Sequence, residues 1–169
     1  MGVLGFHVLA VVVLIQASPI SEPEDGPQAR AVKVVLERYT CACNSKDLDS
    51  ISQVFSHDPD IVLMGTYLPT RCVGWNNVAA WYKELFSSSG KFTIQHRNIE
   101  IKVLPSGNSA FLLCDQDGNG NYKGKEYSFE GVRTTWVLVK QKGQWRVVHA
   151  HWSLPADPNQ TANSAPRSD

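Results

Sequence analysis

The stretch that most limits the fold runs from Glu126 to Pro155 and reads EYSFEGVRTTWVLVKQKGQWRVVHAHWSLP. Its two halves both show the period of two that a half-buried strand needs, because successive side chains of a strand point to opposite faces of the sheet. One parity of the first half holds Tyr127, Phe129, Arg133, Thr135, Val137 and Val139, and one parity of the second holds Trp145, Val147, His149, His151 and Ser153. The stretch therefore predicts a β-hairpin.

The turn of this hairpin decides which side chains meet. If Gln141-Lys142-Gly143 is a three-residue loop, the two strands have a fixed register. That register sets Val139 opposite Trp145, Thr135 opposite His149, and Arg133 opposite His151. One face would then run from apolar residues near the turn to a polar end, as the lining of a ligand pocket commonly does. The polar end would hold Arg133, Thr135, His149, His151 and Ser153. A two-residue loop would shift the register and scatter this set.

The length and charge of the chain limit its partners. The 169 residues are enough for one domain with a sizeable core. Sixteen basic residues balance sixteen acidic ones. This balance argues against nucleic acid or an anionic membrane as the main partner, since both attract a basic excess. Five tryptophans fit an aromatic-lined core or pocket.

The N-terminus has the pattern of a secretory signal peptide. Val8 to Ile15 is an uninterrupted apolar run, and no charged residue lies between Val3 and Ala17. The run is too short to span a bilayer and suits a signal peptide, although Lys and Arg are missing ahead of it. We therefore predict a signal peptide over residues 1–17, a secreted protein, and no membrane contact after cleavage.

Secretion would make the four cysteines potential disulfide partners. Cys41 and Cys43 lie two apart on a predicted helix and point in different directions, so they should not pair with each other. Cys72 and Cys114 are then their possible partners, and four buried free thiols are the alternative. Asn159 begins an Asn-Gln-Thr glycosylation sequence, which also fits secretion.

The pattern along the chain predicts an α+β domain over residues 28–155. A linker over residues 18–27 precedes it and a disordered tail over 156–169 follows it. The predicted helices cover about residues 28–44, a second segment capped by Asp47, and a third that Asn76 or Asn77 caps and that ends at Phe86. The predicted strands cover 61–64, 91–104 and 109–115, and a loop over 117–124 leads into the hairpin. Helices that precede a meander predict three helices packed on one face of an antiparallel sheet.

Three segments of the sequence resemble the NTF2-like superfamily, also called SnoaL-like or ketosteroid-isomerase-like. They are NSKDLDSISQVFSHDPDIVLM from Asn44, VGWNNVAAWYKELF from Val73, and the ending R-x-T…W-x-x-x-H-x-H-x-S-x-P from Arg133. The ending is also similar to that of the calcium/calmodulin-dependent kinase II association domain. The resemblance implies a cone-shaped curved sheet closed by helices (a cystatin-like fold), an internal pocket, and a homodimer or larger homo-oligomer.

The resemblance does not fix the activity, because this fold carries isomerases, hydrolases, cyclases and assembly modules. The ketosteroid isomerases hold a carboxylate base in the strand after the second helix. The matching residues here, Ile61 to Met64, are all apolar. Proton abstraction by that mechanism is therefore not expected at this position.

Two patterns suggest metal sites. Asp115 to Glu126 has the spacing of an EF-hand calcium loop, but the segments on both sides read as strands, whereas an EF-hand needs helices. His149 and His151 would need a third ligand from elsewhere to hold a metal. We predict no metal and no cofactor.

Our leading hypothesis is a secreted domain that binds a small amphiphilic molecule in an internal pocket. The predicted ligand-binding residues are Arg133, Thr135, His149, His151, Ser153 and Trp75. One alternative is an isomerase, cyclase or hydratase that uses His149 or His151 as acid and base. Another is an oligomerisation module, by analogy with the kinase association domain.

Overall fold

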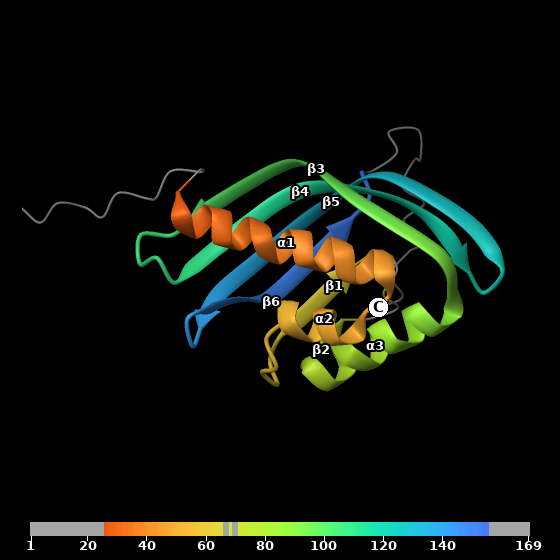
Figure 1. Ribbon diagram of the computed structural model, residues 1–169, viewed down its shortest axis with the longest axis horizontal. Helices are drawn as coiled ribbons and strands as arrows, with labels where there is room; N and C mark the ends of the chain where they lie inside the picture. Colours follow the sequence, from red (N-terminus) through yellow and green to blue (C-terminus); the bar gives the residue numbers. More distant parts are fainter. Residues whose placement is uncertain (1–25, 66–67, 69–70, 156–169) are drawn as a thin grey trace, which may run out of the picture.

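The structure is a computed structural model, and it describes residues 26–65, 68 and 71–155 (Figure 1). The predicted α+β class is confirmed. Its elements, in chain order, are α1 (Pro27–Ser45), α2 (Leu48–Val54), β1 (Val62–Gly65), β2 (Cys72–Val73), α3 (Trp75–Ser88), β3 (Ser89–Val103), β4 (Ser109–Tyr122), β5 (Lys125–Gln141) and β6 (Gln144–Ser153). None of the helices described is long and apolar enough to span a membrane.

The six strands form one curved sheet in the order β2-β1-β6-β5-β4-β3. Neighbouring strands are antiparallel except β1 and β6, which are parallel, so the sheet is mixed rather than wholly antiparallel. Figure 1 shows the long strands β3, β4 and β5 arching over α1, while α2 and α3 lie at the end of the sheet that carries β1 and β2. We call the side of the sheet that faces α1 the inner face and the opposite side the outer face.

The helix ends follow local chemistry, with two departures from the predicted caps. Asp47 caps α2 as predicted, because its carboxylate accepts a hydrogen bond from the Ser50 amide at 3.0 Å. Lys46, rather than Asn44, ends α1 in the left-handed conformation. The Asn44 side chain instead pairs with the backbone of Ile94, donating at 3.1 Å and accepting at 2.7 Å, so it ties α1 to β3.

The start of α3 is set by a glycine. Gly74 occupies the N-cap position with φ 79°, so the predicted caps Asn76 and Asn77 lie inside the helix. The Asn77 amide donates back to the Val73 carbonyl at 2.8 Å. A side chain on Gly74 would meet the Pro59 carbonyl oxygen at 2.9 Å, so both the φ angle and the space favour glycine.

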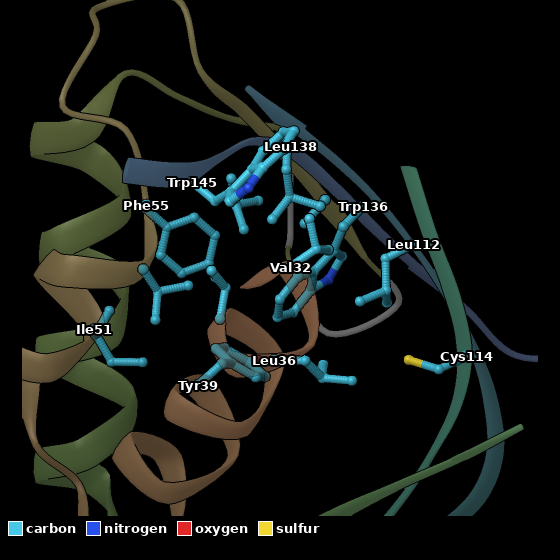
Figure 2. Packing of buried hydrophobic residues seen from close by; sticks show 14 of the residues in the cluster. Val32, Leu36, Tyr39, Ile51, Phe55, Leu112, Cys114, Trp136, Leu138 and Trp145 are labelled. Carbon is cyan, nitrogen blue, oxygen red and sulfur yellow. The ribbon is translucent and has the colours of Figure 1, made fainter. Parts of the chain in front are cut away.

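The core lies between α1 and the inner face of the sheet. Figure 2 shows Val32, Leu36 and Tyr39 of α1 directed toward Trp136 of the sheet. Tyr39 and Trp136 meet edge to face with ring centroids 4.9 Å apart, and Trp136 is fully buried. Each aliphatic side chain buried here stabilises the fold by roughly 1.5–3 kcal/mol.

The two turns on either side of β5 each contain two residues rather than the lengths predicted. Lys142-Gly143 joins β5 to β6, with φ angles of 49° and 80°. Lys123-Gly124 joins β4 to β5, also at 49° and 80°, so most of the predicted 117–124 loop is strand. Two positive φ angles are typical of a type I′ turn, whose twist matches that of the strands that it joins.

A β-bulge changes the face to which β5 side chains point. Gln116 of β4 lies opposite Val132 and Gly118 lies opposite Phe129, so β5 has one residue more than β4 between these pairs. Gly131, in this interval, has φ 65°. As a consequence Phe129 and Val132 both reach the inner face, although they have opposite parity.

A second bulge does the same in β6. Leu138 lies opposite Val147 and Val137 lies opposite His149, so Val148 is the extra residue. Val147 is fully buried on the inner face, whereas His149 turns to the outer face. The predicted register of the hairpin is therefore wrong, and neither strand keeps one parity on one face.

Candidate functional site

A cavity of about 670 Å³ lies on the inner face of the sheet. This volume is within the range of sites for small molecules. Helix α1, helix α3 and the strands β3 to β6 all contribute to its wall. The lining residues are Tyr39, Cys43, Gly65, Leu68, Trp81, Glu84, Leu85, Phe92, Gln116, Tyr122, Lys125, Glu126, Tyr127, Phe129, Val132 and Trp152.

Two parallel aromatic rings form one wall of the cavity. Tyr127 and Phe129 have ring centroids 6.3 Å apart and planes 6° from parallel. They lie against two glycines of β4: a side chain on Gly118 would come within 2.5 Å of the Phe129 ring, and one on Gly120 within 2.9 Å of the Tyr127 hydroxyl. The glycines therefore provide the space that this aromatic wall needs.

Gln116 is a buried polar side chain in this largely apolar lining, with 7% of its surface exposed. Its Oε1 lies 3.2 Å from Trp152 Nε1 and 3.2 Å from His96 Nε2. His96 Nδ1 in turn lies 2.9 Å from the Thr40 hydroxyl of α1. A series of hydrogen bonds thus runs from α1 through β3 to Gln116 of β4 and Trp152 of β6 in the cavity wall.

His96 is held in its neutral form. Burial lowers the pKa of His96 from 6.5 to about 4, and the hydrogen bond to Gln116 and the charge of Asp117 offset only part of this effect. The cause is the cost of placing a charged imidazolium away from water. The imidazole therefore acts as a hydrogen-bonding group at neutral pH.

The titratable groups deep in the cavity are also uncharged. Burial raises the pKa of Cys43 to about 12 and raises that of Tyr39 well above its usual value. Glu84 differs, because hydrogen bonding from Ser88 and the charge of Lys123 lower its pKa. The wall thus combines neutral interior groups with an ionised carboxylate on α3.

The predicted polar set comes together, but on the outer face. Arg133 pairs with Ser153, Thr135 with His151, and Val137 with His149. Arg133 donates to the Leu154 carbonyl at 3.1 Å. These residues are not among the described residues that line the cavity. A ligand-binding or catalytic role for His149 and His151 stays a prediction.

Trp75, the sixth predicted ligand-binding residue, lies at the start of α3. Its ring stacks on His57, with centroids 4.4 Å apart and planes 17° from parallel. It too is absent from the described lining of the cavity. The contact holds the start of α3 against the segment that follows α2.

The four cysteines are free thiols. Cys43 and Cys114 are buried, Cys72 is half-buried and Cys41 is exposed on α1. The structure therefore has free thiols rather than disulfides. That alternative predicted four buried thiols, whereas Cys41 is exposed.

The sequence with EF-hand spacing is a strand hairpin, not a helix–loop–helix unit. Asp115 and Asp117 both pair with Arg97, at 2.9 Å each. Asp115 also accepts from Asn98 at 2.7 Å, and Asp117 accepts from the Gly131 amide at 2.8 Å beside the bulge. Within the described part of the chain, no three His, Cys, Asp or Glu side chains gather as a metal site would require.

Sequence reasoning missed Gln116 as a site residue because the predicted strand ended at Asp115. Ala110, Leu112 and Cys114 alternate as buried residues on β4, and Gln116 continues this series. A polar residue in an apolar period-two series was the available signal. Phe129 was recognised only as a member of the alternating pattern of the hairpin.

Comparison with known proteins gives the following matches. A family model for the SnoaL-like domain matches residues 32–157. An NTF2-like superfamily protein from Salmonella enterica serovar Typhimurium has 21% identity and a TM-score of 0.71, covering 80% of this chain and 96% of that one. The comparison with curated proteins returned no match.

Two further solved structures are similar in fold. A ketosteroid isomerase-like protein from Erwinia carotovora atroseptica has 20% identity and a TM-score of 0.60, with 76% of this chain and 98% of that one covered. A candidate calcium/calmodulin-dependent protein kinase II association domain from Xanthomonas campestris has 20% identity and a TM-score of 0.65, with 87% and 99% covered. At these identities the likeness concerns the fold.

Proposed function

The chain belongs to the SnoaL-like domain family, and from that premise we propose that it binds a small, largely apolar molecule in its inner-face cavity. The observation that carries the proposal is the cavity itself, about 670 Å³ in volume and walled mainly by aromatic and aliphatic side chains, with one buried amide and with Glu84, Lys125 and Glu126 as its charged residues. An apolar cavity of this size with few polar groups is the usual form of a ligand site.

The wall supports binding more than acid–base catalysis. A general base needs a pKa near the working pH. Tyr39 and Cys43 stay protonated at neutral pH, because burial raises both pKa values, and the lowered pKa of Glu84 makes this carboxylate a weak base. In β1, Leu63 is fully buried and Val62 and Met64 flank it, so this strand brings no carboxylate. An isomerase, cyclase or hydratase reaction through His149 or His151 remains the alternative, and it would have to take place on the outer face.

The test is a titration of the full chain with 1-aminoanthracene, a neutral fluorescent probe. We expect a saturable, one-to-one rise in fluorescence. Leu85→Trp fills part of the cavity and should weaken probe binding at least tenfold. Val137→Trp, a matched change on the outer face, should leave binding unchanged. Absence of saturable binding, or equal binding by both variants, would refute the proposal.

We further propose that the outer face joins two copies of the chain. Val137 of β5, Met64 of β1 and Val73 of β2 lie on the outer face and are 37%, 38% and 44% exposed. Exposed apolar side chains that share one sheet face are typical of an association surface. Light scattering should give the mass of a dimer for the wild type and of a monomer for Val137→Glu, while Lys142→Glu in the turn stays dimeric. A monomeric wild type would refute this.

We also propose that the protein is secreted. The supporting pattern, the apolar run within residues 1–17, and the acceptor Asn159 both lie outside the described residues. Expression of the full chain in a secreting eukaryotic host should give a product in the medium that begins at Ser18 and carries a glycan that is lost in Asn159→Gln. Retention of the intact N-terminus in the cell would contradict the prediction.

A further inference from the structure

The hydrogen bonds of Gln116 fix the direction in which its amide points. The indole of Trp152 can only donate a hydrogen bond, so the atom 3.2 Å from its Nε1 must be the amide oxygen of Gln116. The amide nitrogen then lies on the other branch of the side chain. Packing alone would leave the two orientations equivalent, and the indole removes this ambiguity.

The same oxygen sets the tautomer of His96. Because Gln116 Oε1 is an acceptor, His96 Nε2, at 3.2 Å, must carry the proton. In the neutral imidazole Nδ1 is then an acceptor, and the Thr40 hydroxyl, 2.9 Å away, divides its single proton between this nitrogen and the Leu36 carbonyl, also at 2.9 Å. A rotated amide would turn its nitrogen toward the indole N–H of Trp152 and lose that hydrogen bond, so Trp152 holds the orientation of the amide.

The amide nitrogen of Gln116 keeps its two donors free. The side chain lines the cavity with only 7% of its surface exposed. Within the part of the chain that the structure describes, no group accepts a hydrogen bond from this nitrogen. A ligand that displaces water from this nitrogen leaves its N–H groups unsatisfied unless it supplies an acceptor, so a ligand with an acceptor at this position binds more tightly than one without.

The charges around the cavity select the kind of acceptor. His96 is neutral behind the amide, and Tyr39 and Cys43 are protonated beside it. Lys125 is the cation among the described lining residues, and it lies at the exposed turn of the β4–β5 hairpin, next to Glu126. A carboxylate at Gln116 would therefore be a buried charge without a counter-ion, which is unfavourable.

We propose that Gln116 determines the specificity of the cavity by donating a hydrogen bond from Nε2 to a neutral carbonyl group on an otherwise apolar ligand. The inference rests on the proposed binding function and names the chemical class of the ligand: an apolar ketone or ester, in preference to the hydrocarbon or the carboxylate of the same shape.

Three matched probes test the inference in the wild-type full chain. They are 2-acetylnaphthalene, 2-ethylnaphthalene and 2-naphthoate, each titrated against bound 1-aminoanthracene at pH 7. We expect the ketone to bind roughly tenfold more tightly than the hydrocarbon, as one hydrogen bond to a buried donor allows. The carboxylate should bind more weakly than both. Equal binding of ketone and hydrocarbon, or preference for the carboxylate, would overturn the inference while the binding function stands. Failure of 1-aminoanthracene itself to bind would instead remove the binding function.

Gln116→Met removes the donor at nearly constant volume, and we expect it to abolish the preference for the ketone while hydrocarbon binding persists. Gln95→Met, an exposed change on β3, is the matched control and should keep the preference. Since Gln116→Met also leaves Trp152 and His96 without an acceptor, it could fail to fold. Side-chain amide NMR of the wild type then decides: the Gln116 amide protons should shift with 2-acetylnaphthalene and not with 2-ethylnaphthalene. Equal shifts with both probes would overturn the inference.

Discussion

Acid should destabilise this fold through His96 before it protonates most carboxylates. Burial lowers the pKa of this imidazole from 6.5 to about 4. The unfolded chain takes up the proton near pH 6.5, whereas the folded chain does not until about pH 4. Between these values the unfolded state binds more protons, so the free energy of unfolding falls as pH falls, and the loss is complete near pH 4.

The size of the effect follows from the separation of the two pKa values. A separation of about 2.5 pH units corresponds to about 3 kcal/mol of unfolding free energy. This is a large part of the free energy of unfolding of a typical domain, which is about 5–15 kcal/mol. The loss should therefore be visible as a lower urea midpoint at pH 5 than at pH 7.

The assay is urea unfolding of the wild type and of His96→Gln at pH 7.5, 6.5, 5.5 and 4.5. His96→Gln keeps a donor that can reach Gln116 but cannot titrate, so the difference between the two proteins isolates His96. Three carboxylates also have lowered pKa values, because they accept hydrogen bonds: Asp47 from Ser50, Asp58 from Ser56 and Asp117 from Arg97. Their protonation in acid lowers the free energy of unfolding of both proteins alike. A stability difference that does not change with pH, or an imidazole NMR titration of His96 near pH 6.5, would refute the reasoning.

Two further predictions concern the cavity wall and the thiols. Gly118→Ala should lower the free energy of unfolding by about 1–3 kcal/mol in urea titrations, because its Cβ would lie 2.5 Å from the Phe129 ring and 2.8 Å from the Thr93 carbonyl oxygen. Gly90→Ala, with its nearest contact at 3.4 Å, is the control, and an equal loss in both would contradict the steric explanation. In a thiol-reagent assay at pH 8, exposed Cys41 should react first, whereas Cys43 and Cys114, whose pKa values burial raises to about 12, should react only on unfolding. Rapid modification of all four thiols in the folded protein would contradict this.

The sequence predicted those features that depend on neighbouring residues. The buried positions of α1, among them Val32, Leu36 and Tyr39, recur at helical spacing, and the structure buries all of them. Asp47 caps α2 because its carboxylate and the amide that it binds lie three residues apart. Such signals can be recognised in a single sequence because the residues that interact lie within a few positions of one another.

The predictions that failed depended on residues far apart in the chain. Gly118 and Gly120 were interpreted as loop residues, since glycines are common in turns. In the structure both lie in a strand. Gly118 leaves space for the ring of Phe129, and Gly120 leaves space for the hydroxyl of Tyr127, both on the next strand. Nothing within β4 itself distinguishes a glycine that turns the chain from one that makes room for a partner.

The two bulges explain how the hairpin could suggest a pocket and yet place its polar residues outside it. Without the bulge near Gly131, Phe129 would share a face with Arg133, and without the extra Val148, Val147 would share one with His149. Each bulge moves the apolar part of a strand to the inner face and leaves the polar part on the outer face. The same two strands therefore contribute to both the cavity and the outer surface. A substitution on one face should not affect what the other face does. A change at Val137 should alter association without altering binding, and a change at Val132 should do the reverse.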